Sequence, residues 1–253
     1  MRAAVAALHI TEPVPSGAAP SFPVIIVAMR QLGVAFLAFS SLALVLRPAA
    51  EAQTVERSAA LSSPADLEAQ GAKLDAVSYR GRAAVHATSD AGNAPAGLAV
   101  LKGSTFKDGT IEVDLAGSPG AGAFEGARGF VGIAFRLNGE RYECFYLRPT
   151  NGRSDDQLRR NHSTQYVSEP AFPWQRLRQE SPGVYESYVD LEPGAWTKVK
   201  IVVAGTKARL FVHDAPQPVL VVNDLKLGEI QGAVALWIGP GTEAHFANLR
   251  ITR

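Results

Sequence analysis

The sequence predicts an all-β protein built as a two-sheet antiparallel β-sandwich. Runs rich in β-branched and aromatic residues recur about every ten residues and are separated by Gly, Pro, Asn or Asp. No long helical periodicity competes with them. We expect strands at 74–79, 83–88, 98–101, 110–116, 130–137, 141–148, 165–168, 185–191, 196–204, 208–213, 219–223, 232–238 and 245–252. Because no linker-like boundary separates these runs, we expect one domain over 72–253.

An export signal is predicted ahead of this domain. Residues 32–46 form an apolar run that follows the basic start at Met29 and Arg30. The run is short for a membrane span and ends at the small-x-small pattern of residues 50–52, which is typical of signal-peptidase cleavage. We therefore expect a signal peptide over 29–52 and a secreted or periplasmic protein. A membrane anchor spanning 24–46 is the alternative.

The segments on either side of the signal are expected to lie outside the fold. Residues 1–28 are rich in Ala and Pro and are interpreted as an over-extended or disordered leader. Residues 53–71 are polar and Ala/Ser-rich, and we expect them to form a linker with at most one helical turn, at 64–68. After signal cleavage, no membrane attachment is expected.

Composition narrows the range of partners. The 25 basic and 24 acidic residues give a net charge of +1, which provides no electrostatic basis for nucleic-acid binding. The single cysteine, Cys144, excludes an internal disulfide and is expected to be a buried thiol. The five histidines lack metal-ligand spacing, and no Asp/Asn cluster demands calcium. No metal or cofactor is expected, and the oligomeric state stays open.

A predicted hairpin assigns side chains to the two faces of its ribbon. Asn138-Gly139 lies between two strong strands and predicts a two-residue turn at these positions. With that register, Arg136 opposes Arg141, and Ala134 opposes Glu143. Two faces follow from alternation: a core face with Val131, Ile133, Phe135, Leu137, Tyr142, Cys144 and Tyr146, and an open face with Phe130, Gly132, Ala134, Arg136, Arg141, Glu143, Phe145 and Leu147. We expect Arg136 and Glu143 to emerge together from the open face. An ordinary exposed ion pair is the alternative.

The same alternation places further candidates away from the core. In 233–238 it puts Trp237 on the non-core face, where an indole suits a sugar platform. In 184–190 the polar positions include Glu186, a possible second carboxylate. Whether these strands share one sheet is left open.

Residues 149–182 interrupt the strand pattern and are dense in Arg, Asn, Gln, His and aromatic residues. Long irregular segments within compact domains are usually functional, so we expect binding groups here, with a decorated surface loop as the alternative. Residues 154–157 could cap a short helix that carries Arg159 and Arg160. The candidates from this segment are His162, Arg159, Gln165, Tyr166 and Trp174.

The stretch from Phe106 to Arg148 resembles the concanavalin A-like jelly rolls, specifically the 3-keto-disaccharide hydrolase domain family. The motifs are F-x-D-G-T-I-E-V-D-L, G-F-V-G-I-A-F-R and Y-E-C-F-Y-L-R, and residues 196–201 and 232–251 resemble that family's closing strands. The resemblance implies that Arg136 and Glu143 face an open cleft. The sequence departs from the family at Phe145, where a polar residue is expected, at 213–216, and at Trp237, where Gln is usual.

Three functions are compatible with these residues. The first is a secreted carbohydrate-binding domain, with stacking by Phe145, Tyr166, Trp174 and Trp237, hydroxyl contacts from Arg136, Glu143 and Gln165, and Arg159 as a further binding group. The second is a glycoside-processing hydrolase, with Glu143 or Glu186 as general acid/base and with Arg136, Arg159 or His162 stabilising negative charge. The third is a non-catalytic envelope domain that binds protein.

Overall fold

The fold was analysed in a computed structural model that describes residues 55–89 and 96–253. The leader predicted at 1–28 and the signal peptide predicted at 29–52 lie outside the described residues. Within the described ranges, no helix has both the length and the apolar character needed to cross a membrane.

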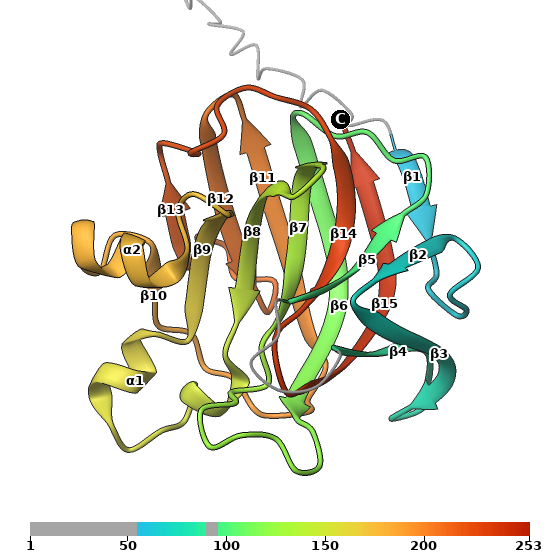
Figure 1. Cartoon of the computed structure of the whole chain (residues 1–253), viewed down its shortest axis with the longest axis horizontal. Helices are drawn as coiled ribbons and strands as arrows, with labels where there is room; N and C mark the ends of the chain where they lie inside the picture. Colours follow the sequence, from blue (N-terminus) through green and yellow to red (C-terminus); the bar gives the residue numbers. More distant parts are fainter. Residues whose placement is uncertain (1–54, 90–95) are drawn as a thin grey trace, which may run out of the picture. The chain divides into compact units, whose positions relative to one another are not determined.

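Two antiparallel sheets pack face to face, which confirms the predicted β-sandwich (Figure 1). The eight-stranded sheet has the order β13-β12-β11-β6-β15-β4-β3, with β1 also paired to β15. Its strands are β1 (Val55–Ala59), β3 (Ala72–Tyr79), β4 (Arg82–Ser89), β6 (Gly109–Pro119), β11 (Thr197–Ala204), β12 (Lys207–Val212), β13 (Leu220–Val222) and β15 (Thr242–Thr252).

The seven-stranded sheet has the order β10-β9-β8-β7-β14-β5-β2. Its strands are β2 (Leu67–Gln70), β5 (Gly97–Leu101), β7 (Val131–Asn138), β8 (Arg141–Leu147), β9 (Thr164–Glu169), β10 (Glu186–Ser187) and β14 (Ala233–Ile238). The 3-10 helix η1 (Pro149–Asn151) and the helices α1 (Gln157–Asn161) and α2 (Trp174–Glu180) complete the described elements. Figure 1 shows α1 and α2 beside β9 and β10.

The core lies between the sheets, and strand alternation supplies it. In β6, Ile111, Val113 and Leu115 are at most 1% exposed, whereas Glu112 and Asp114 point away from the core. In the seven-stranded sheet, however, seven consecutive residues of β7 are buried, so side chains are covered on both of its faces. The outer face of this sheet, the one turned away from the eight-stranded sheet, is therefore not an ordinary solvated surface.

The linker predicted at 53–71 is corrected by the structure. β1 pairs with β15 in one sheet, and β2 pairs with β5 in the other. Leu61 and Leu67 are 4% and 5% exposed, so this segment contributes to the core. The polar, Ala/Ser-rich composition concealed strands whose stability comes from pairing and from two buried leucines rather than from intrinsic propensity.

The predicted hairpin register is wrong by one residue. The two turn residues are Gly139 and Glu140, and the ladder is interrupted between Phe135 and Asn138. Arg136 has φ +54°, a left-handed conformation that produces a β-bulge at this point. Beyond the bulge, Phe135 opposes Glu143, so the side chains of β8 lie on the faces opposite to those predicted.

Arg136 therefore lies inside the sandwich and not on an open face. It is 0% exposed, although it carries a charge. Its guanidinium donates hydrogen bonds to the backbone oxygens of Lys107 (3.0 Å from Nε), Gly205 (2.7 Å from Nη2) and Gly228, and forms an ion pair with Asp108 at 3.2 Å. Lys107 and Asp108 precede β6, Gly205 lies in the turn after β11, and Gly228 follows β13. Arg136 therefore holds these three segments together.

Glu143 is also buried, which corrects its predicted placement. It is 0% exposed and accepts hydrogen bonds from the hydroxyl of Tyr166 (2.5 Å) and the backbone N–H of Leu227 (2.7 Å). Burial raises the pKa of Glu143, while these hydrogen bonds and the charge of Arg136 act in the opposite direction. Glu143 thus binds the loop between β13 and β14, which Arg136 also contacts, and it does so from the core side of the sheet.

Phe145 and Tyr166 are likewise interior, contrary to the prediction that they stack on a sugar. They oppose each other on β8 and β9, are 2% and 0% exposed, and their ring centroids lie 5.5 Å apart. The one-residue register shift accounts for Phe145, and pairing with Phe145 places Tyr166 on the same face.

The segment 149–182 carries two short helices that flank β9. The expected helix is present as α1, with Asp156 as the N-cap accepting from the N–H groups of Leu158 and Arg159. The strand expected at 185–191 is shorter, because only Glu186 and Ser187 pair with β9. Cys144 is a free, fully buried thiol, as predicted.

Candidate functional site

A single row of paired residues crosses the outer face of the seven-stranded sheet. Residues that oppose each other on neighbouring strands point to the same face. The row runs through Glu186 on β10, Gln165 on β9, Tyr146 on β8, Gly132 on β7 and Trp237 on β14. Three of the predicted site residues therefore share one sheet and one face.

Gly132 allows two aromatic rings to meet across the middle of this row. A Cβ atom at Gly132 would lie 2.6 Å from the Cβ of Tyr146, so a side chain there would collide with its neighbour. Without that side chain, Tyr146 and Trp237 stack with centroids 4.6 Å apart and planes inclined by 18°. The indole N–H of Trp237 donates to the hydroxyl of Tyr142 at 3.2 Å. The predicted outward orientation of Trp237 is confirmed, but the ring is only 7% exposed.

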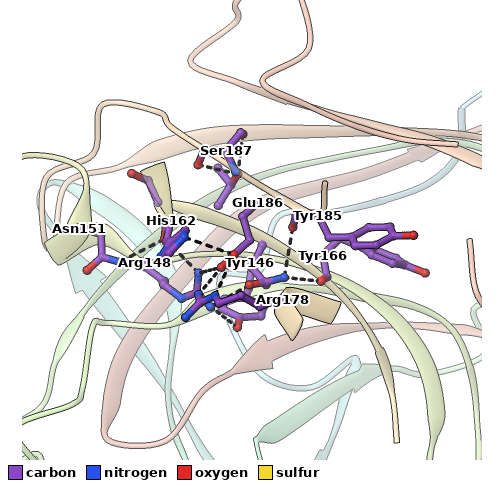
Figure 2. A network of polar contacts seen from close by, with 12 residues as sticks. Tyr146, Arg148, Asn151, His162, Tyr166, Arg178, Tyr185, Glu186 and Ser187 are labelled. Atoms are coloured by element: carbon purple, nitrogen blue, oxygen red, sulfur yellow. Dashed lines mark hydrogen bonds and ion pairs between the residues drawn. The ribbon is translucent and has the colours of Figure 1, made fainter. Parts of the chain in front are cut away.

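Arg148 organises the polar part of the row, as Figure 2 shows. It follows β8 and is 5% exposed. Its guanidinium donates to the carboxylate of Glu186 (3.0 Å), the side-chain oxygen of Gln165 (2.9 Å), the hydroxyl of Tyr146 (2.9 Å) and the backbone oxygen of His162 (3.0 Å). Four partners from separate elements hold it in one orientation.

Glu186 accepts hydrogen bonds from a second arginine as well. Arg178 on α2 donates through Nε to Oε2 at 2.9 Å and through Nη2 to Oε1. Burial alone would raise the pKa of Glu186. The hydrogen bonds from Arg178 and the charges of Arg148 and Arg178 outweigh this effect and hold the pKa below its usual value. At neutral pH this carboxyl is ionised, so it has no proton to donate as a general acid.

His162 and Trp174 complete the cluster on its solvent side. Nε2 of His162 lies 3.5 Å from Oε2 of Glu186, and burial together with the charges of Arg178 and Arg148 lowers the pKa of His162. Trp174, the first residue of α2, stacks on Arg178 (4.6 Å from guanidinium to ring centroid) and lies 5.9 Å from Arg148. Trp174 is 37% exposed and presents an aromatic surface to solvent.

Among the predicted site residues, the structure brings His162, Gln165, Trp174, Glu186 and Trp237 together. Arg159 lies on α1, the helix whose C-cap is His162. The structure separates this group from Arg136, Glu143, Phe145 and Tyr166, which lie on the core side of the same strands. We call the cluster of Tyr146, Arg148, His162, Gln165, Trp174, Arg178 and Glu186 the Arg148 site.

Three members of the Arg148 site were not predicted. Tyr146 was assigned to the core and Arg148 to no role, because the assumed register reversed the faces of β8. With the observed pairing of Gly132 and Tyr146, both would have been placed beside Trp237. Arg178 carries no local signal, since only the fold of the segment after β9 brings α2 over the carboxylate.

A hollow lies elsewhere, on the outer face of the eight-stranded sheet, and is lined by residues of β6, β11 and β15. Its volume is about 570 Å³. Its charged groups include the ion pairs Arg82–Asp114 (3.0 Å) and Lys198–Asp214 (2.9 Å), in which Arg82, Lys198 and Asp214 are 46% to 70% exposed at the side chain. Such solvated pairs contribute little and orient no ligand firmly, so we place the candidate site at the buried, hydrogen-bonded Arg148 site instead.

No metal centre is apparent in the part of the chain that the structure describes, because no group of three or more His, Cys, Asp or Glu side chains gathers there. The Arg148 site itself contains two arginines, one carboxylate and one imidazole. It therefore offers hydrogen-bond donors and an aromatic surface rather than a set of metal ligands.

Comparison with solved structures identifies the architecture. A Bacillus subtilis protein of unknown function with a galectin-like fold superposes with a TM-score of 0.53 at 10% identity, covering 79% of this chain and 98% of that one. The carbohydrate binding module CBM66 from Bacillus subtilis superposes with a TM-score of 0.50 at 12% identity, covering 73% and 96%. The chain has a galectin-like, concanavalin A-like jelly-roll fold.

The galectin-like fold agrees with the jelly roll that the sequence motifs implied. Neither a protein-family model nor a curated protein sequence matches the chain. At such low identity the superpositions establish the fold alone, and function has to be argued from the Arg148 site.

Proposed function

We propose that this protein is a secreted or periplasmic carbohydrate-binding domain that holds a saccharide at the Arg148 site. The observation that carries the proposal is an exposed Trp174 ring stacked on Arg178 above a fixed Arg148–Glu186–Gln165 network. Saccharides combine apolar ring faces with hydroxyl groups, and an aromatic platform beside oriented polar groups matches that chemistry.

Further support comes from the fold and from the N-terminal sequence. The superposed CBM66 structure is named as a carbohydrate binding module. The signal-peptide pattern at 29–52 agrees with a ligand outside the cytoplasm. Because Glu186 is held ionised by two arginines, the site lacks the protonated carboxyl that glycoside hydrolysis uses, and this favours binding over catalysis.

The proposal is tested by replacing Trp174 with alanine. We expect Trp174→Ala to weaken saccharide binding about tenfold or more, which corresponds to about 1.4 kcal/mol, because the exposed stacking surface is removed. Binding is measured on a glycan array with the purified protein, followed by calorimetric titration of the glycans that bind.

Trp196→Ala is the matched control. Trp196 lines the hollow on the eight-stranded sheet, and the guanidinium of Arg82 lies over its ring at 5.4 Å. Because this position is on the other sheet, its replacement should leave the affinity for saccharides unchanged. If no glycan binds, or if Trp196→Ala abolishes binding while Trp174→Ala does not, the proposed site is wrong.

A further inference from the structure

One arginine beside the Arg148 site has no counter-charge. Arg159 lies in the last turn of α1 and forms no ion pair with any described residue. Its Nε atom is buried and has no hydrogen-bond partner in the described part of the chain. A buried, unpaired guanidinium nitrogen is costly to maintain, so its presence needs an explanation.

Arg159 and a second arginine, Arg128, are both connected to η1: α1 packs against η1, and the N–H of Thr150 donates to the backbone oxygen of Arg128 at 3.3 Å. Among the described residues, Arg128 donates only to the backbone oxygens of Glu125 (2.7 Å) and Ala127 (2.9 Å). Burial, with the charges of Arg159 and Arg148, lowers the pKa of Arg128, and Glu125 compensates for only part of this effect. Arg148 is already neutralised by Glu186, whereas neither Arg128 nor Arg159 forms an ion pair with any described residue.

Two buried side-chain oxygens belong to η1, the turn that directly follows Arg148. The hydroxyl of Thr150 and the side-chain oxygen of Asn151 are buried and have no hydrogen-bond partner within 55–89 and 96–253. The backbone N–H of Thr150 donates to the oxygen of Arg128 at 3.3 Å, and Nδ2 of Asn151 donates to the oxygen of His162 at 3.1 Å. Arg148 contacts the same His162 oxygen, so the two groups of residues adjoin each other. Figure 2 shows Asn151 next to His162 and Arg148.

We propose that the saccharide bound at the Arg148 site carries an anionic substituent, a carboxylate or a sulfate, which is held by Arg159 and Arg128 beside Thr150. The proposal rests on the proposed function and specifies its ligand class. The planar guanidinium fork matches the oxygens of carboxylates and sulfates, and the Thr150 hydroxyl adds a donor. The free oxygen of Asn151 is left to accept from a sugar hydroxyl.

The inference is tested with two matched pairs of polymers. Galacturonan and its fully methyl-esterified form share a backbone and differ in the carboxylate, and dextran sulfate and dextran differ in the sulfate. We expect at least one charged polymer to bind more than tenfold tighter than its neutral partner, with affinity falling as salt is raised. The pair that shows the preference identifies which of the two anions is recognised.

The variant Arg159→Ala should remove this preference. We expect at least a tenfold loss of affinity for the charged polymer and no change for the neutral one, with partial retention in Arg159→Lys. Because Arg159 lacks partners in the free protein, the Tm of unliganded Arg159→Ala should equal or exceed that of the parent, whereas a residue with a structural role would lower it.

Arg209→Ala is the charge-matched control. Arg209 is exposed on β12 in the other sheet, and its removal should not alter binding. If Arg209→Ala weakens binding as much as Arg159→Ala does, or if neither charged polymer is preferred, the inference is wrong. If, in that case, neutral glycans still bind and Trp174→Ala weakens them, the proposed function stands without the anionic substituent.

Discussion

Arg148 shows how a charged side chain can be used inside a binding surface. Both terminal nitrogens are engaged, and the flat guanidinium lies over the ring of Tyr146 at 5.1 Å and near that of Trp174. Each contact removes some rotational freedom, so the donors and the carboxylate are already oriented before a ligand arrives. Affinity in such a site depends on the fixed geometry more than on the number of charges.

A second residue, His245 on β15, predicts how stability depends on pH. Its imidazole is 9% exposed, stacks on Tyr79 and lies 4.8 Å from the ring of His86, which is opposite Asp75 in the β3–β4 ladder. Burial, with the charge of His86, lowers the pKa of His245 to about 4. The folded state therefore keeps this ring neutral over a range in which the unfolded chain takes up a proton.

Lowering the pH from about 6.5 to about 4 should therefore destabilise the protein by an amount on the order of 1 kcal/mol through this residue. Above that window both states are neutral and the effect vanishes. Urea unfolding as a function of pH measures it, and His245→Phe, which keeps an aromatic ring, should flatten the profile. The exposed His213 provides the control His213→Gln. An unaltered profile in His245→Phe would show that other groups are responsible.

At the scale of elements, the hairpin of β7 and β8 decides which residues meet the ligand. The bulge at Arg136 sends Glu143 and Phe145 inward and leaves Tyr146 and Arg148 outside. Arg136 and Glu143 then hold the loop before β14 by contacts to Gly228 and Leu227. The pair that the sequence motifs suggested for an open cleft thus serves the architecture of the sandwich.

Removing the Arg136 side chain should be severely destabilising. We expect Arg136→Met to lower the free energy of unfolding by about 3 kcal/mol or more, because several buried backbone oxygens lose their donor. Arg141→Met, in the same hairpin but exposed, should change it by less than about 0.5 kcal/mol. Chemical denaturation of both variants makes the comparison. Equal stabilities would mean that these buried hydrogen bonds contribute little.

The hairpin also marks the limit of prediction from sequence. Alternation correctly placed Trp237 and Glu186 off the core, because β14 and β10 carry no irregularity at these residues. It failed for β8, because a left-handed arginine has no sequence signature and a single bulge reverses every following side chain. The Arg148 site was therefore predicted from its loop and its neighbouring strands, while its central residue was missed.

At the scale of the whole molecule, the two-sheet architecture was predictable and its first strands were not. Strands with strong apolar patterns, such as β6 and β11, follow from the sequence directly. β1 and β2 are short and polar, and they owe their conformation to partners that are distant in sequence, β15 and β5. The strand conformation of β1 and β2 is therefore decided by pairing in the assembled sheets and not by the residues of the local segment.

These first strands should be important for stability despite their composition. Leu67 on β2 is 5% exposed in the core, and we expect Leu67→Ala to cost about 2 to 5 kcal/mol in unfolding free energy. Glu68→Ala on the adjacent exposed position is the control and should be close to neutral. Thermal and urea unfolding distinguish the two. A neutral Leu67→Ala would indicate that residues 55–70 associate only loosely with the sandwich.

The left-handed residue in the β7–β8 hairpin has a consequence for how this fold diversifies. Deleting or inserting one amino acid there would exchange the whole inward set of β8 for the outward set in a single genetic event, whereas point substitutions would have to change each side chain in turn. Descendants of one jelly roll can thereby come to display unrelated surfaces while most of their strands align. The presence or absence of this bulge consequently decides which set of β8 side chains such a protein presents to a ligand.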